Sequence, residues 1–160
     1  MGRLTRSISI NCPPSRVWRI IEKHLEHPQI STLEQEPGEI QESHGEALSE
    51  QRAGVGTRTR WFYSYKRKPF TWDDVVTDWE PQRKVAWKTV STWDMQDSFS
   101  LQPEGKGTRL TYDMNYHLPY GPLGWLYGKM VLESRMNRHL TGVLQRMKKL
   151  CENPLGSEND

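Results

Sequence analysis

Cysteine is scarce in this 160-residue sequence: only Cys12 and Cys151 are present, and neither has a CxxC partner. The two residues lie at opposite ends of the chain, and a bridge needs Cα atoms within about 7 Å of each other. Two cysteines do permit one disulfide, but this separation favours two free thiols in a reducing compartment.

Long apolar runs and an excess of charge of one sign are also missing. No segment approaches the ~20 apolar residues of a membrane span, and residues 1–6 contain no apolar core of a signal peptide. The 22 Lys and Arg residues are nearly balanced by 20 Asp and Glu residues, which disfavours a nucleic-acid partner. These features predict a cytoplasmic protein with no membrane span.

Aliphatic and aromatic residues make up only 34% of the sequence, yet seven residues are Trp and six are Tyr. Large amphipathic rings bury much apolar surface and carry a polar atom that needs a partner. The composition therefore indicates an interior built from rings, arranged around a space rather than as a solid aliphatic core.

Apolar periodicity divides the chain into a strand, a short helix, an extended middle and a helical last third. Alternation predicts a strand over Leu4–Cys12, and apolar residues recur at helical spacing from Val17 to Leu25, before Pro28. Residues 29–37 are either irregular or a second short helix. Six further strands are predicted between turn signals, over Gly38–Leu48, Val55–Lys66, Phe70–Trp79, Lys84–Val90, Met95–Gln102 and Thr108–Leu118.

A helical pattern runs from about Leu123 to Glu152, and residues 153–160 form a polar tail that we expect to be disordered. Short connections make the strands consecutive antiparallel hairpins. The long helix is the only element able to cover one face of such a sheet. We therefore predict an α+β fold over residues 1–152 as one domain, with a curved seven-stranded antiparallel sheet wrapped around the C-terminal helix.

Short turn and strand motifs occur in a definite order along the chain. They are Ile8–Trp18, Gly54–Thr57, Val76–Pro81, Val85–Trp87, Gly105–Tyr112 and Gly121–Trp125. In this order they resemble the START-like, or SRPBCC, superfamily, most closely its polyketide cyclase/dehydrase-type branch. The resemblance implies the helix-grip fold, with one or two short helices after the first strand. It also implies hydrophobic-ligand carriage, quinone handling, aromatic polyketide cyclisation or co-chaperone work, and fold alone does not choose among these.

Strand alternation predicts which side chains point toward the helix, because the less charged face of each strand should be the inward one. For Phe70–Trp79 this rule does not decide which face is the inward one, since Val76 shares its face with Asp74 and Asp78. The predicted ligand-binding cavity consists of Trp61, Tyr63, Trp87, Phe99, Tyr112, Met114 and Tyr116 on the sheet and Leu126, Met130 and Glu133 on the helix. An ordinary aromatic core is the alternative; a pocket for a drug-sized ligand would measure roughly 300–1,000 Å³.

Two charged residues interrupt the apolar face of the terminal helix. At 100° per residue, Trp125, Leu132 and Met136 lie on one face, Lys129 falls within it, and Glu133 lies at its edge. Burying an unpaired charge is costly. The two residues therefore line a wet cavity, pair or snorkel at its mouth, or overhang the sheet in solvent.

The histidines do not form a metal or catalytic motif. His24 and His27 lie three residues apart but lack a third ligand at a characteristic spacing. His44, His117 and His139 are isolated, and we interpret each as a strand or surface residue. We predict no metal, no cofactor and no catalytic residue.

Glycines and basic residues mark the predicted turns. Gly56, Gly105 and Gly107 should serve turns, because a strand follows Gly56, whereas a phosphate-binding loop leads into a helix. Residues 66–68, Lys-Arg-Lys, form a basic hairpin tip. We interpret this tip as a solvated turn, with contact to an anionic surface as the alternative.

Three functions remain open. The first is binding or transport of a small hydrophobic molecule, aromatic or ring-containing, between sheet and helix. The second is a cyclase- or aromatase-like enzyme in which one acid–base group moves a proton. The third is a non-catalytic module for a protein partner, which would need an apolar outer sheet face; Arg58, Arg60, Lys84 and Lys88 are predicted there instead. We favour the first, acting as a monomer or homodimer.

Overall fold

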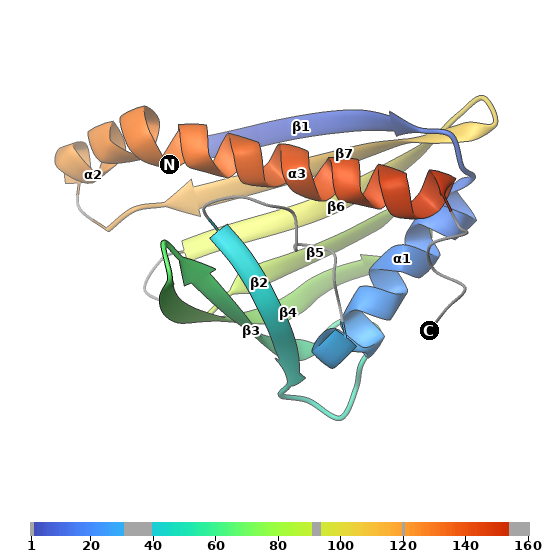
Figure 1. Ribbon diagram of the computed structural model, residues 1–160, viewed down its shortest axis with the longest axis horizontal. Coiled ribbons are helices and arrows are strands. Elements are labelled where there is room, and N and C mark those ends of the chain that lie inside the picture. The colour runs from blue at the N-terminus through green and yellow to red at the C-terminus, as the bar shows by residue number, and fades with distance from the viewer. Residues whose placement is uncertain (1, 31–39, 91–93, 120, 154–160) are drawn as a thin grey trace.

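The computed structural model describes residues 2–30, 40–90, 94–119 and 121–153, and places the helices on one side of a twisted sheet (Figure 1). The strands are β1 (Gly2–Ile10), β2 (Ile40–Ala47), β3 (Arg58–Tyr65), β4 (Lys68–Glu80), β5 (Lys84–Thr89), β6 (Asp94–Glu104) and β7 (Gly107–His117). The helices are α1 (Pro14–Glu26), the 3-10 turn η1 (Pro28–Ile30), α2 (Gly121–Tyr127), the π-helical turn η2 (Gly128–Leu132) and α3 (Glu133–Glu152).

The sheet confirms the predicted fold class. Its seven strands have the order β1-β7-β6-β5-β4-β3-β2, and every neighbouring pair is antiparallel. The segment predicted as irregular or helical begins with η1, but residues 31–37 lie outside the described residues, as do residues 154–160 of the predicted tail. None of the helices in the described ranges is long and apolar enough to cross a lipid bilayer.

Helix α1 carries the chain from one edge of the sheet to the other, since β1 and β2 are consecutive strands at opposite edges. Pro14 suits the first turn of a helix because its fixed φ is helical and its missing N–H has no partner there anyway. Val17, Trp18 and Ile21 form the buried face. The helix ends where the His27 N–H donates to the Lys23 carbonyl, just before Pro28.

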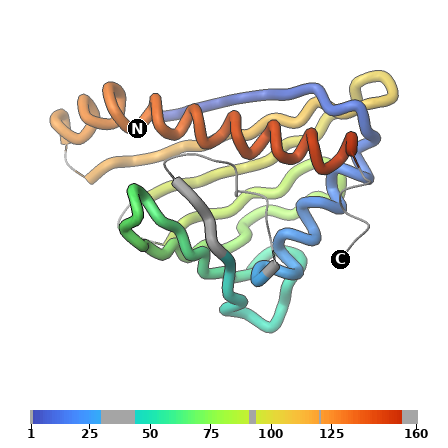
Figure 2. The backbone as a smooth tube through the Cα atoms, viewed as in Figure 1, coloured from blue at the N-terminus to red at the C-terminus, as the bar shows by residue number. Residues whose placement is uncertain are grey.

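The C-terminal helix runs alongside β1 and across the helix-facing side of β7 (Figure 2). Its buried residues Met136, Leu140, Val143, Leu144, Met147 and Cys151 follow helical spacing and pack into one core with the inward residues of β1, β6 and β7. The helix begins at Gly121, slightly earlier than predicted, and is interrupted by the π-helical turn η2.

The ends of β1 and α3 meet at one end of the molecule. The Asn11 N–H donates to Oε1 of Glu152 at 2.8 Å, and the buried Cys12 thiol is hydrogen-bonded to Cys151. Both cysteines are free thiols, as predicted. Their separation along the chain does not keep them apart, because Cys12 and Cys151 are neighbours in the fold. Burial and the Cys12 thiol raise the pKa of Cys151 to about 12.

The glycine prediction is also confirmed. Gly54 and Gly56 have φ of 111° and 92°, a conformation open to glycine, and the chain then enters strand β3 rather than a helix. Gly105 turns between β6 and β7 with φ of 60°. Gly107 starts β7, where a Cβ would lie 2.4 Å from the Ile10 carbonyl oxygen, so the close approach of β1 requires glycine.

Candidate functional site

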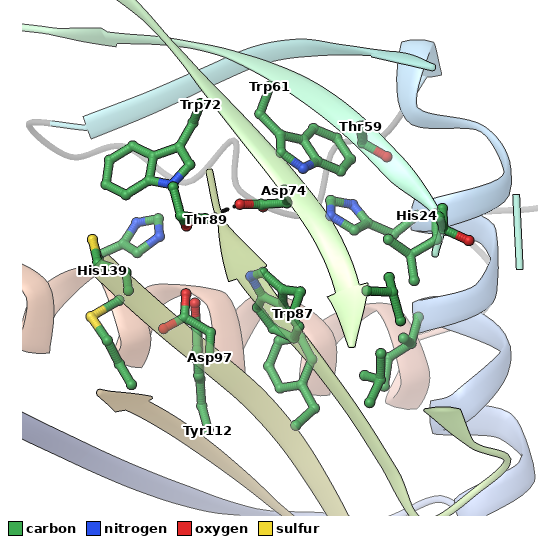
Figure 3. A pocket seen from close by; sticks show the side chains of 18 of the residues that line it. His24, Thr59, Trp61, Trp72, Asp74, Trp87, Thr89, Asp97, Tyr112 and His139 are labelled. Atoms are coloured by element: carbon green, nitrogen blue, oxygen red, sulfur yellow. Dashed lines mark hydrogen bonds between the residues drawn. The ribbon is translucent and has the colours of Figure 1, made fainter. Parts of the chain in front are cut away.

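A cavity of about 80 Å³ lies between the concave face of the sheet and the helices α1 and α3 (Figure 3). Strands β3, β4, β5, β6 and β7 supply one wall, and Ile21, His24 and Leu25 of α1 close one side. Met136 and His139 of α3 lie on the other. The space is smaller than a drug-sized ligand needs, because indole rings project into it.

Aromatic rings form much of the wall. Trp61 is fully buried and stacks on the imidazole of His24, with ring centroids 4.4 Å apart and planes 7° from parallel. Trp87 packs on Phe99 and Tyr112 at 5.2 and 5.9 Å. These contacts hold the rings in place from the sheet side.

A second aromatic group lies on the β3–β4 hairpin. Tyr63 stacks on Phe70 at 5.4 Å between ring centroids, and Trp72 lies edge-on to Tyr63 at 6.2 Å. All three rings line the cavity and are only partly buried. They form its less enclosed side, toward the turn that joins the two strands.

Polar groups face the same space. The Thr89 hydroxyl donates to Oδ1 of Asp74 at 3.0 Å and accepts the indole N–H of Trp72. Behind the wall, Arg52 donates to the Thr59 hydroxyl at 2.9 Å and to the Leu25 carbonyl. Burial lowers the pKa of this guanidinium below its usual value. The cavity therefore offers hydrogen-bonding groups as well as ring faces.

Asp97 is the most buried carboxylate of the cavity wall, with 8% of its surface exposed. It lies on β6 between Trp87 of β5 and Met114 of β7 in the strand register. His139 reaches the same space from α3, and Figure 3 shows both side chains at one end of the cavity, with Tyr112 below Asp97. A carboxylate, an imidazole and a phenol thus come together from three elements.

Six of the ten predicted cavity residues line the observed cavity, namely Trp61, Tyr63, Trp87, Phe99, Tyr112 and Met114. Tyr116 is buried, but its hydroxyl donates to Oε1 of Glu133 at 2.9 Å, beyond the cavity. Burial is the largest cause and this hydrogen bond the second of a rise in the pKa of Tyr116 to about 12. That the six residues bind a ligand stays a prediction.

Leu126 and Met130 do not line the cavity, and both are largely exposed. The π-helical turn η2 contains an extra residue per turn, so the 100° rotation used for the prediction fails across it. Trp125 is turned outward for the same reason, and Lys129 lies over its indole ring at 5.1 Å. Of the three alternatives given for Lys129, the structure therefore supports the one in which the first turns of the helix extend beyond the sheet into solvent.

Strand β4 contains a register shift between Val76 and Asp78, which explains its mixed sequence pattern. Before the shift, Trp72, Asp74 and Val76 face the cavity. After the shift, the alternate positions of the strand face inward, and Trp79 packs edge-on against Trp18 at 4.9 Å between ring centroids. A strict period of two could not assign one inward face to this strand.

Sequence reasoning missed His24, Asp97 and His139. Asp97 occupies an inward position of the alternation that includes Met95 and Phe99, so its position was a usable signal. His139 follows Leu132 by seven residues and therefore shares its helix face. The interpretation of His139 as a strand or surface residue was wrong, and His24, which the sequence analysis considered only as a metal ligand, also lines the cavity.

The curved sheet gripping a long C-terminal helix defines a START-like, or SRPBCC, protein. The chain belongs to the family described as polyketide cyclase/dehydrase and lipid transport, whose model matches residues 1–152. No curated protein matches the chain.

Many solved structures share the fold. Protein CV1439 from Chromobacterium violaceum is 14% identical, with a TM-score of 0.68, covering 94% of this chain and 96% of its own. Ara h 8.0201 is 9% identical with a TM-score of 0.69 and coverages of 94% and 97%. The di-domain ARO/CYC BexL of the BE-7585A biosynthetic pathway is 13% identical with a TM-score of 0.69, and the match covers 94% of this chain and 47% of BexL.

Proposed function

We propose that this chain binds or carries a small hydrophobic molecule that contains a ring. The observation that carries the proposal is one space shared by Trp61, Trp72 and Trp87 and by polar groups of Asp97 and His139. A mostly apolar pocket with a few polar groups that point into it is typical of a ligand-binding site. The family description covers lipid transport and cyclisation, which supports a hydrophobic ligand in general.

The cavity size limits the ligand. Its 80 Å³ is well below the roughly 300–1,000 Å³ of pockets for drug-sized molecules. The ligand we propose therefore has about one ring, with a hydroxyl or carbonyl group directed at Asp97 or His139. A larger molecule enters only if the partly buried rings of Tyr63 and Phe70 turn outward.

Native mass spectrometry and fluorescence titration test the binding. Purified protein is examined for a co-purified small molecule, and apo protein is titrated with phenols, naphthols and saturated-ring analogues. We expect ring compounds with one polar group to quench the emission of Trp61, Trp72 and Trp87. The variant Trp18→Phe removes an indole outside the cavity and should leave the quenching intact. No co-purified molecule and no response across the panel would refute the proposal.

A cyclase-like enzyme is the second candidate, and the placement of Asp97, His139 and Tyr112 around one cavity favours it. An imidazole can remove a proton from a carbon between two carbonyls, and the resulting enolate carbon can attack another ketone of the chain to close the ring. An acid can protonate the oxygen of the attacked ketone, and the hydroxyl formed there then leaves as water together with a proton from the neighbouring carbon. The test substrate is a linear poly-β-ketone that closes with loss of water. Turnover that is lost in His139→Gln while ring compounds still bind would support the enzyme.

We also propose that residues 1–152 act as one domain in the cytoplasm, as a monomer or homodimer. The two buried free thiols suit a reducing compartment. Size-exclusion chromatography with light scattering would give the oligomeric state.

A further inference from the structure

At the start of the C-terminal helix the small residues face the protein and the large apolar residues face solvent. Gly124 and Gly128 face the protein, where a Cβ on Gly128 would lie 2.8 Å from Leu118. The large apolar residues point away, with exposed fractions between 48% and 79% for Leu123, Trp125, Leu126, Tyr127 and Met130. We call these five side chains the α2 patch. Several large exposed apolar side chains on two helical turns are typical of an interaction site.

Basic residues lie at the same end of the molecule. The β3–β4 hairpin tip, Lys66-Arg67-Lys68, is exposed, and Figure 1 shows this hairpin and α2 at one end of the long axis. Arg135 of α3 lies over the Tyr65 ring at 5.1 Å, and Lys66 lies over the same ring at 5.4 Å. The nearby Glu133 accepts a hydrogen bond from Tyr116. This end thus combines apolar and positively charged side chains.

The two charged residues at the centre of the hairpin tip, Lys66 and Arg67, adopt an unfavourable backbone conformation. Tyr65 pairs with Lys68, so Lys66 and Arg67 form a two-residue loop, and their φ values are 48° and 66°. Such loops favour Asn-Gly because both central residues need positive φ. Strained positions occupied by unsuitable residues are concentrated at functional sites. The strain is an observation independent of the α2 patch.

We propose that the α2 patch and the basic hairpin tip dock this protein onto an anionic phospholipid bilayer surface. Trp and Tyr rings sit at the headgroup level, Leu and Met side chains enter the acyl boundary, and Lys and Arg contact anionic headgroups. A second copy of the chain would place two positively charged ends together, which disfavours a dimer at this face. Docking would present the Tyr63–Phe70 side of the cavity, on the same hairpin, to the membrane.

Vesicle co-sedimentation of the full chain tests the docking, with vesicles of phosphatidylcholine alone and of phosphatidylcholine mixed with phosphatidylserine. We expect binding to the mixed vesicles that weakens at high salt. Leu123→Ser with Met130→Ser should reduce partitioning by about tenfold or more. Lys66→Asn with Arg67→Gly should reduce it by about fivefold per charge, while raising the thermal midpoint because the turn is relieved. Lost binding with raised stability cannot come from misfolding.

Matched controls lie elsewhere on the surface. Val55→Ser removes a similarly exposed apolar side chain from a loop before β3. Lys106→Asn with Arg109→Gln removes two positive charges at the β6–β7 end of the molecule (Figure 1). Both should bind mixed vesicles as the wild type does.

The proposal is overturned if mixed vesicles do not bind, or if the patch and tip variants bind as well as the controls. It is also overturned if light scattering shows a dimer that Leu123→Ser with Met130→Ser dissociates. No ligand is added to the vesicles, so a failure of docking leaves the proposed ligand binding standing, and the reverse holds as well.

Discussion

Replacing Trp87 by Ala separates a ligand cavity from a solid core. A fully packed Trp costs about 3–5 kcal/mol when truncated to Ala, because transfer energy is lost and a void remains. Trp87 is only partly buried and borders existing free space, so it has fewer partner atoms to lose. Its ring contacts with Phe99 and Tyr112 are worth roughly 0.5–1.5 kcal/mol each. We therefore expect Trp87→Ala to cost about 2–3 kcal/mol.

Trp18 is the matched control, because it is 3% exposed, lies outside the cavity and packs against Trp79. Trp18→Ala should cost the full value of about 3–5 kcal/mol and leave ligand choice unchanged. Trp87→Ala should instead shift the preference from single-ring to fused-ring compounds, since it enlarges an 80 Å³ space by an indole group. Urea unfolding followed by circular dichroism gives the stabilities, and titration with the ring panel gives the preference. Equal stability losses in both variants, with no ligand response, would show that the interior is solid.

Three further predictions concern stability and thiol reactivity. The pKa of Tyr116 is raised in the folded protein to about 12. The contribution of this shift to the free energy of unfolding is therefore complete below the ordinary pKa near 10 and is lost as the pH rises from about 10 to about 12. Tyr116→Phe should flatten the pH–stability curve in that range. Gly107→Ala should destabilise by about 1–3 kcal/mol, seen as a lower urea midpoint, because its Cβ meets the Ile10 carbonyl; an unchanged midpoint would contradict the register of β1. The Cys151 thiol is 1% exposed and burial raises its pKa to about 12, so it should react with a thiol reagent only after unfolding. Rapid labelling of Cys151 in the native protein would contradict this burial.

The arrangement of elements was predictable because each strand and helix has its own period and its own turn signals. Proline residues mark the start and end of α1, and glycines form the turn before β3 and the turn between β6 and β7. The sheet side of the cavity followed from alternation alone, since Trp61, Trp87 and Tyr112 occupy inward positions of regular strands. Alternation failed in β4, where the register shift exchanges the two faces.

The helix side of the cavity was not predictable in the same way. A single π-helical turn changes the rotation between residues 128 and 132, and the sequence shows no proline or other signal for it. Leu126 and Met130 were therefore assigned inward although both are exposed. The outward α2 patch is a direct consequence of that turn and of the close approach of Gly128 to the protein.

The sequence by itself determined the fold class, the seven strands and the ring-rich sheet wall, because these depend on local period and turn chemistry. Only the tertiary structure brought Asp97, His139 and His24 to one space and placed Cys12 beside Cys151. Proximity between distant segments depends on sheet twist, strand register and the crossing of helices over the sheet. These arise from the packing of the whole chain, so local periodicity carries no record of them.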